Sequence, residues 1–135
     1  MANRAVEVGC DLELVEPRSC AFAADYFTAD EQALISRTPV ANQPLVLALL
    51  WSAKESALKA MRVGLRADTR SVAVEIPALC PVDSHMWRPL LVCHSTGERH
   101  GWWRVADEMV RTVVAVPWPQ RPEFLRMSDS PPAGD

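Results

Sequence analysis

Two short segments of the chain hold the residues whose types and spacing could do chemistry. The first is VGCDLE at residues 8–13, which carries Asp11 and Glu13 two positions apart. The second is WSAKESALKA at residues 51–60, in which charged side chains interrupt an apolar stretch. Carboxylates grouped with lysines are the residue types that bind a hard divalent cation together with the phosphate groups of a ligand.

The first segment lies in a predicted β-strand from Ala5 to Leu14. Its apolar residues alternate with polar ones, and one side of the strand carries Val6, Val8, Cys10, Leu12 and Leu14. Because side chains alternate between the two faces of a strand, Asp11 and Glu13 project from the same face, with Cα atoms about 7 Å apart. The two carboxylates therefore point the same way.

The second segment lies in a predicted long helix. Pro44 suits the first turn, the helix runs from Leu45 to about Arg62, and Gly64 marks its end. Its first half is apolar almost all round and must therefore be buried. The turn that follows should emerge at the rim of the core, where charged groups can meet a ligand.

Within this helix, Glu55, Lys59 and Arg62 fall at positions i, i+4 and i+7 and so share one stripe. Lys54 lies about 100° away around the axis. Three carboxylates with phosphate oxygens and water would complete an octahedral Mg²⁺ shell, and lysines beside them would neutralise a pyrophosphate. Glutamate–lysine pairs at this spacing also decorate ordinary solvated helices, so residue types alone leave both interpretations open.

The two segments together, in this order and about 40 residues apart, resemble the paired signatures of the 4′-phosphopantetheinyl transferase superfamily. The resemblance covers roughly residues 6–76. It implies that Asp11 and Glu55 are metal ligands, and Glu13 matches the additional acidic ligand of the surfactin-synthetase-activating type. Lys54 and Lys59 match the motif lysines, of which Lys59 is the better candidate for contacting a coenzyme A phosphate.

The function implied by the resemblance is that of a Mg²⁺-dependent holo-[acyl-carrier-protein] synthase. Such an enzyme moves the phosphopantetheine arm of coenzyme A onto a serine of an acyl or peptidyl carrier protein, as in fatty acid or polyketide biosynthesis, and releases 3′,5′-ADP. Catalysis would rest on Glu55, which is also a candidate base for the serine, and on Lys59. Arg18, just after the acidic strand, could bind coenzyme A phosphate or be ordinary surface charge. The alternatives are a non-catalytic half-transferase module within a larger synthase and a different Mg²⁺-dependent phosphoryl enzyme.

The length of the chain bears on its assembly. Members of the surfactin-synthetase-activating type are usually about twice as long, with two halves that clasp coenzyme A, and this sequence resembles the second half. The shorter holo-acyl-carrier-protein-synthase type builds its sites between identical subunits. We therefore expect self-association, as a trimer rather than a dimer; the chain could also be a domain excised from a larger synthase.

The order of elements predicts an α+β fold, with an antiparallel sheet packed against the long helix, corresponding to a single half of the transferase fold. Ser19 and Thr28 are predicted helix caps. One domain is expected over residues 1–118 and a flexible proline-rich tail over 119–135. The predicted later strands lie at 69–76, 88–94, 100–105 and 109–116.

Composition narrows the class of protein further. The net charge of −3 provides no clustered basic surface for nucleic acid or anionic membrane, and no apolar run approaches the roughly 18 residues of a membrane span. The cysteines show no metal-binding spacing and are predicted to be buried, reduced thiols; they are Cys10, Cys20, Cys80 and Cys93. These features predict a cytoplasmic protein.

Overall fold

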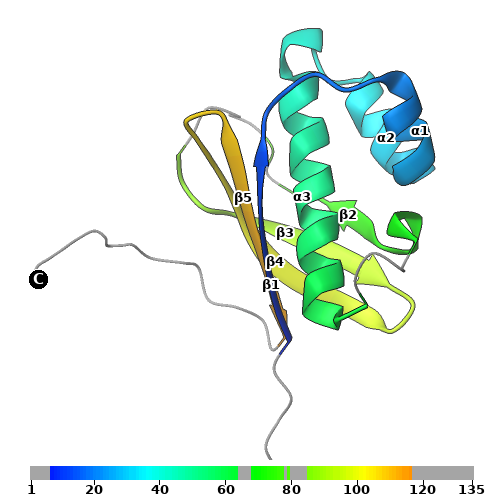
Figure 1. The fold of residues 1–135 in the computed structure, drawn as a ribbon, viewed down its shortest axis with the longest axis vertical. Helices are drawn as coiled ribbons and strands as arrows, with labels where there is room; N and C mark the ends of the chain where they lie inside the picture. The colour runs from blue at the N-terminus through cyan, green and yellow to red at the C-terminus, as the bar shows by residue number, and fades with distance from the viewer. Residues whose placement is uncertain (1–6, 64–67, 78, 80–84, 117–135) are drawn as a thin grey trace, which may run out of the picture.

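The computed structural model describes residues 7–63, 68–77, 79 and 85–116, so the tail expected at 119–135 lies outside them (Figure 1). Its elements follow the order strand, three helices and four strands, with short 3₁₀ turns at Val40–Asn42 and Thr69–Ser71. They are β1 (Glu7–Leu14), α1 (Cys20–Tyr26), α2 (Ala29–Ser36), α3 (Gln43–Met61), β2 (Ala73–Glu75), β3 (Arg88–His94), β4 (Gly97–Ala106) and β5 (Met109–Val116).

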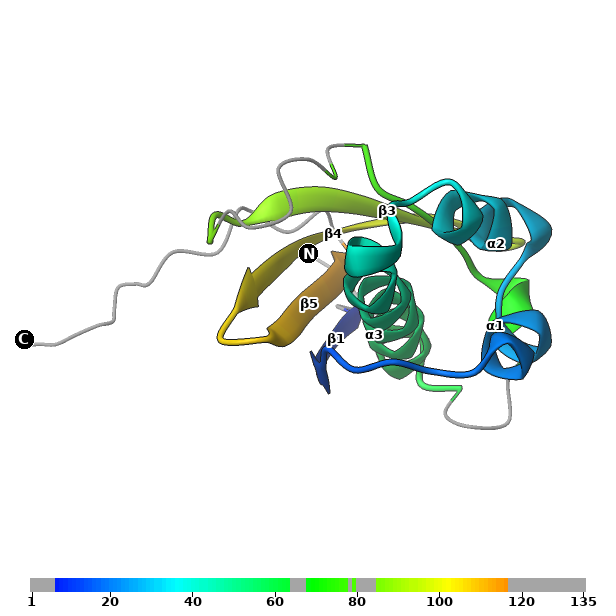
Figure 2. The same cartoon turned by 90° about the horizontal axis from the view of Figure 1, so that it is seen from above.

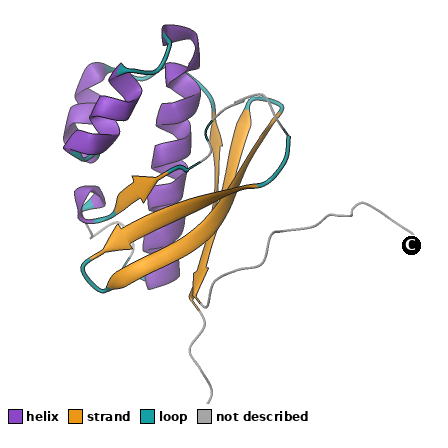
Figure 3. Ribbon diagram, turned by 180° about the vertical axis from the view of Figure 1, so that it is seen from behind, coloured by secondary structure: helices purple, strands orange, loops and turns teal. Residues whose placement is uncertain are grey.

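The architecture is two-layered. The strands form one sheet in the order β1-β5-β4-β3-β2, with every neighbouring pair antiparallel. Helix α3 packs along one face of this sheet, with α1 and α2 beside it (Figures 1 and 2). Seen from behind, the three helices all lie on the same side of the sheet (Figure 3). The predicted α+β class, with an antiparallel sheet against a long helix, is confirmed.

The helix boundaries follow from local sequence. Ser19 caps α1 by accepting a hydrogen bond from the backbone N–H of Phe22, and Thr28 and Glu31 form a reciprocal capping box at the start of α2. A proline lies in the first turn of α3, as predicted. The helix ends at Arg62, whose φ of 61° is left-handed. The expected terminator, Gly64, lies outside the described residues.

The core lies between α3 and the inner face of the sheet. Residues 46–50 of α3 are all buried, which confirms that the first half of this helix is core. They pack in one cluster with Phe27 and with inward-facing residues of the sheet, among them Leu90, Val92, Trp103, Val110 and Val114. This cluster holds α3 against the sheet and so sets where the second half of the helix emerges.

The structure departs from two sequence-based expectations. Strand β2 is shorter than the predicted 69–76, because the chain before it makes a 3₁₀ turn that is capped by a hydrogen bond from the Arg70 backbone N–H to the Asp68 side chain. Cys10 is exposed and Cys93 is half-buried, so the prediction of buried thiols is wrong for Cys10. Cys10 shares the outer face of β1, which no described helix covers.

The apolar face of strand β1 points outward, whereas the apolar face of an amphipathic strand usually packs on the core. Its polar face, with Gly9, is turned towards α3, while Val8, Leu12 and Leu14 are 54%, 49% and 47% exposed. A Cβ atom at Gly9 would lie 2.6 Å from the backbone nitrogen of Ala60 and nearer still to the carbonyl oxygen of Ser56. Gly9 therefore permits an approach of strand to helix that any side chain would block.

We predict that Gly9→Ala lowers the free energy of unfolding by about 3 kcal/mol or more, because the clash is with backbone atoms that have no rotamer to change. The matched control is Cys10→Ala, one position along on the exposed face, which should change stability by less than about 0.5 kcal/mol. Urea denaturation followed by circular dichroism measures both. Equal stability of the two variants would contradict the close-approach role of Gly9.

Candidate active site

The contact between β1 and α3 brings Asp11 and Lys59 together. The Lys59 Nζ donates hydrogen bonds to Asp11 Oδ1 at 2.9 Å and to the carbonyl oxygen of Cys10 at 3.1 Å. The Asp11 side chain is only 8% exposed, whereas that of Lys59 is 52% exposed. A buried carboxylate on the strand thus faces a half-exposed cation from the helix, and Gly9 allows the close approach of the two elements.

Glu13 continues the same face of β1. Arg18, in the segment after the strand, lies with Nη2 at 3.9 Å from Glu13 Oε1 and at 3.5 Å from Glu16 Oε2. Burial, and after it the neighbouring Asp11 carboxylate, raises the pKa of Glu13 to about 7, while the charge of Arg18 opposes the rise. The structure therefore brings Arg18 to the acidic face, as its place in the sequence indicated.

Glu55 approaches the same acids from α3, one turn before Lys59. Burial, followed by the negative charge of Asp11, raises its pKa above the usual range, and Lys59 opposes the rise. The charge of Glu55 in turn contributes to the raised pKa of Glu13. The charge of Asp11 thus acts on both glutamates across the strand–helix contact, and burial together with this charge makes Glu13 and Glu55 more costly to ionise than exposed glutamates.

The donor chemistry of this cluster fits a hard divalent cation. Asp11 Oδ2 is buried without a hydrogen-bond partner, and the remaining donors are carboxylate oxygens. As the side chains stand, no three acidic, histidine or cysteine groups among the described residues are arranged to hold one ion. Lys59 Nζ lies against Asp11 Oδ1, so Oδ2 is the oxygen of Asp11 that remains without a partner.

Lys54 lies elsewhere, and the prediction that it contacts coenzyme A does not fit this structure. Its side chain is 0% exposed, and Nζ lies 2.8 Å from Glu31 Oε1 and donates to the carbonyl oxygens of Thr69 and Val72. These contacts match the three N–H groups of an ammonium ion. Burial lowers the pKa of Lys54, and the bond to Glu31 opposes that shift. Lys54 therefore fastens α3 to α2 and to the chain before β2.

A buried hydroxyl cluster lies behind the acids and was not anticipated from the sequence. Thr112 Oγ1 lies 2.8 Å from Ser52 Oγ and 2.6 Å from Ser56 Oγ, and Thr112 is the β5 partner of Asp11. The two serines flank Glu55 in the sequence of α3, so the cluster joins β5, the neighbour of the strand that carries Asp11, to the helix that carries Glu55. A threonine within the apolar run MVRTVVAV is the signal that could have shown it.

Two cavities adjoin the site. One of about 370 Å³ is lined by Glu55, by Asp25, Leu58, Asp68 and Thr69, and by the aromatic side chains of Phe22, Tyr26 and Trp51. Phe22 and Tyr26 both contact Trp51, at ring distances of 5.1 and 5.3 Å, and they also form a wall of this cavity. The helical spacing of the two aromatics could not show which side stays open.

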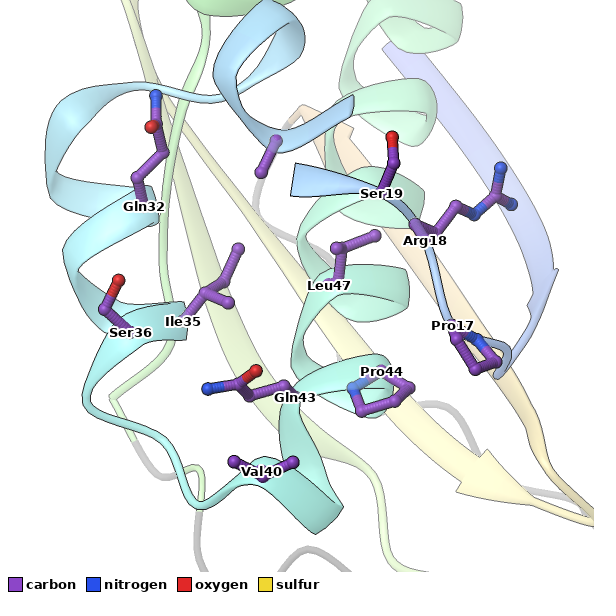
Figure 4. Close-up of a pocket in the computed structure, with 11 residues that line it drawn as sticks. Pro17, Arg18, Ser19, Gln32, Ile35, Ser36, Val40, Gln43, Pro44 and Leu47 are labelled. Carbon is purple, nitrogen blue, oxygen red and sulfur yellow. The ribbon is translucent and has the colours of Figure 1, made fainter. Parts of the chain in front are cut away.

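The second cavity, of about 480 Å³, lies between α1, α2 and the start of α3 (Figure 4). Arg18 and Ser19 lie on one side of it and Ile35 and Ser36 on the other, with Leu47 between them. Arg18 also lies over the Phe22 ring, 4.9 Å from its centroid. Arg18 therefore borders both this cavity and the acidic face of β1.

Comparison with known families identifies the superfamily of the chain. Residues 7–110 match the 4′-phosphopantetheinyl transferase superfamily, and the chain belongs to that superfamily. Membership implies a transferase that uses coenzyme A as substrate and a carrier protein as partner. A search of curated proteins found no match to this chain. No described helix is long and apolar enough to cross a membrane.

The different surroundings of the two lysines predict opposite effects of the same substitution. Lys54→Met should lower the free energy of unfolding by about 3 kcal/mol or more, because it leaves the buried Glu31 carboxylate without a neutralising cation. Lys59→Met removes a half-exposed pair and should cost less than about 1 kcal/mol. Chemical denaturation of both variants measures the difference. Equal losses would contradict the structural assignment of Lys54, and the double variant Lys54→Met with Glu31→Gln should recover part of the loss.

Proposed function

We propose that the protein transfers the 4′-phosphopantetheine arm of coenzyme A to a serine of an acyl or peptidyl carrier protein and releases 3′,5′-ADP. The observation that carries this proposal is that Asp11, Glu13 and Glu55, from a strand and a helix, lie near enough to influence one another, with the Lys59 ammonium group against Asp11. Superfamily membership supports the reaction class.

Asp11, Glu13 and Glu55 are the residues that would hold Mg²⁺, since they supply oxygen ligands from two rigid elements. When bound, the cation would neutralise the pyrophosphate of coenzyme A as charge moves to the leaving group. Lys59, beside Asp11, would neutralise a further phosphate oxygen, and Arg18, beside Glu13, would neutralise another. The chain's contribution is therefore alignment and charge compensation.

Glu55 is also the proposed proton acceptor. In the reaction, the serine oxygen forms a bond to the β-phosphorus, the bond from that phosphorus to the oxygen of 3′,5′-ADP breaks, and the hydroxyl proton passes to the Glu55 carboxylate. In the metal-free protein, burial and the charge of Asp11 raise the pKa of this carboxyl group. The aromatic cavity that Glu55 lines is open beside it and has apolar walls suited to the pantetheine arm.

The test of the proposal is transfer to an apo carrier protein, read by intact-protein mass. Glu55→Gln keeps the shape of the side chain but loses its charge and basicity, and Asp11→Ala removes a predicted metal ligand. We expect each variant to lose at least about 100-fold in transfer rate. Thermal melts should show unchanged or slightly higher stability without metal, because like-charge repulsion is relieved.

The same melts separate binding from chemistry. The stabilisation that Mg²⁺ and coenzyme A give the parent protein should shrink in both variants, because ligand linkage needs an intact site. Glu98→Gln, at an exposed position on β4, is the matched control and should transfer at the parent rate. If Glu55→Gln and Asp11→Ala also modify the carrier at that rate, this cluster is not the active site.

Self-association forms the second part of the proposal, with a trimer favoured over a dimer. The outer face of β1 supports it, since Val8, Leu12 and Leu14 lie together on an edge strand at about half exposure. Apolar side chains grouped on one exposed face are typical of an interaction surface. A neighbouring copy could supply the remaining coenzyme A contacts, as in the shorter members that the sequence resembles in length.

We predict that Leu12→Gln weakens self-association at least about fivefold, because it removes apolar area from this face without changing charge. Val40→Gln, at a position that is 79% exposed and far from β1 in the sequence, is the control and should leave the assembly intact. Light scattering over a concentration series measures both. A parent protein that is monomeric throughout and still transfers the arm would refute self-association without affecting the proposed chemistry.

A further inference from the structure

We propose that Lys59 acts as an internal substitute for the metal: its ammonium group neutralises Asp11 in the metal-free protein, competes with Mg²⁺ for that carboxylate, and becomes available to a ligand phosphate only once the cation has displaced it. This inference rests on the proposed function, because it assumes that Asp11 is a metal ligand. It adds a competition, and an order of binding, that the site residues alone do not imply.

The first support is the geometry at Asp11. Lys59 Nζ lies 2.9 Å from Oδ1 and also donates to the Cys10 carbonyl, so the ammonium group is held by two acceptors of the same strand. The other oxygen, Oδ2, is buried without a hydrogen-bond partner. A divalent cation at Asp11 would therefore meet an adjacent positive charge on one oxygen and a vacant acceptor on the other.

The second support is that Lys59 can leave. Its side chain is 52% exposed and attached to the last turns of α3, whereas Asp11 is only 8% exposed and fixed in a strand. A half-exposed lysine–carboxylate pair contributes little net stability, because water competes for the ammonium group. Displacement thus moves a flexible side chain into solvent and leaves the buried carboxylate for the metal.

The ability to leave its carboxylate partner distinguishes Lys59 from Lys54. Both lysines of the chain belong to the same signature, but Lys54 is fully buried and its ammonium group is saturated by Glu31, Thr69 and Val72. Lys54 cannot leave without exposing a buried charge. Of the two motif lysines, Lys59 is therefore the one that can exchange a carboxylate for a phosphate.

The proposal predicts coupling between the metal and the phosphate ligand. Mg²⁺ that displaces Lys59 from Asp11 releases a cation for the phosphate groups of coenzyme A, so metal binding should strengthen coenzyme A binding beyond the direct attraction of the metal. Because binding linkage is reciprocal, coenzyme A should strengthen Mg²⁺ binding by the same factor. Removing the ammonium group should weaken that coupling and, in the absence of coenzyme A, strengthen metal binding.

The test is isothermal titration of the full chain with Mg²⁺ in the absence of coenzyme A. Lys59→Met removes the competing charge and should bind Mg²⁺ at least about fivefold more tightly than the parent. Lys59→Arg keeps a cation and should stay within about twofold of the parent. Arg37→Met removes one charge at the exposed end of α2 and should also match the parent.

A second measurement uses the unmodified chain and needs no variant to fold. Lysine acylation, read by peptide mass, should be severalfold faster at Lys59 when Mg²⁺ is saturating, because the amine is then free of its two acceptors. Lys54 serves as the internal control and should stay unreactive under both conditions, since it is buried.

The outcomes separate this inference from the proposed function. The competition is overturned if Lys59→Met binds Mg²⁺ no more tightly than the parent, or if the rate of Lys59 acylation does not change with Mg²⁺. Either result would do so even if arm transfer is intact. A parent protein that binds no Mg²⁺ overturns both the competition and the metal assignment. Tighter binding in Lys59→Met, with the two controls at the parent value, supports the competition whatever the carrier protein proves to be.

Discussion

The close approach of β1 to α3 is the constraint on which the rest of the site depends. It exists because Gly9 has no side chain where Ser56 and Ala60 present backbone atoms. Beside this contact, the hydrogen bond between the hydroxyl groups of Ser52 and Thr112 joins α3 to β5, the strand paired with β1. A larger residue at the glycine would separate the elements, and the acids of β1 would no longer face those of α3. Gly9 of the first signature is therefore needed because it lets the strand approach the helix, and not because it takes part in the chemistry.

The two lysines of the second signature lie only five positions apart in the sequence but have different roles. Lys54 is buried with Glu31 and belongs to the fold, while Lys59 is half-exposed beside Asp11 and belongs to the site. The division follows from helix geometry, since residues five apart on an α-helix lie well over 100° apart around its axis. Lys54 faces α2, and Lys59 faces β1, which is an edge strand of the sheet. The same signature therefore supplies both a structural anchor and a movable cation.

The reversed orientation of β1 links the site to assembly. Turning the polar face inward gives Asp11 and Glu13 partners on α3, but it leaves the apolar face, including Leu12, without cover from any described element. In an ordinary two-layer fold this strand would face the other way, because burying its apolar face is favourable. The inverted strand makes sense if the outer face is buried by another molecule, and this is the physical reason that catalysis and self-association are proposed together.

The sequence by itself determined the local features: the caps at Ser19 and Thr28, the long helix, the later strands and the two acids on one face of β1. Each follows from the spacing of neighbouring residues, and the order of the two signatures was enough to indicate the superfamily that residues 7–110 confirm. Only the tertiary structure decided which face of β1 meets the helix, that Lys54 is buried, and that Lys59 lies against Asp11. Spacing gives the angle at which a side chain leaves its own helix or strand. What that side chain meets depends on how segments about 40 residues apart pack, and no local pattern encodes that.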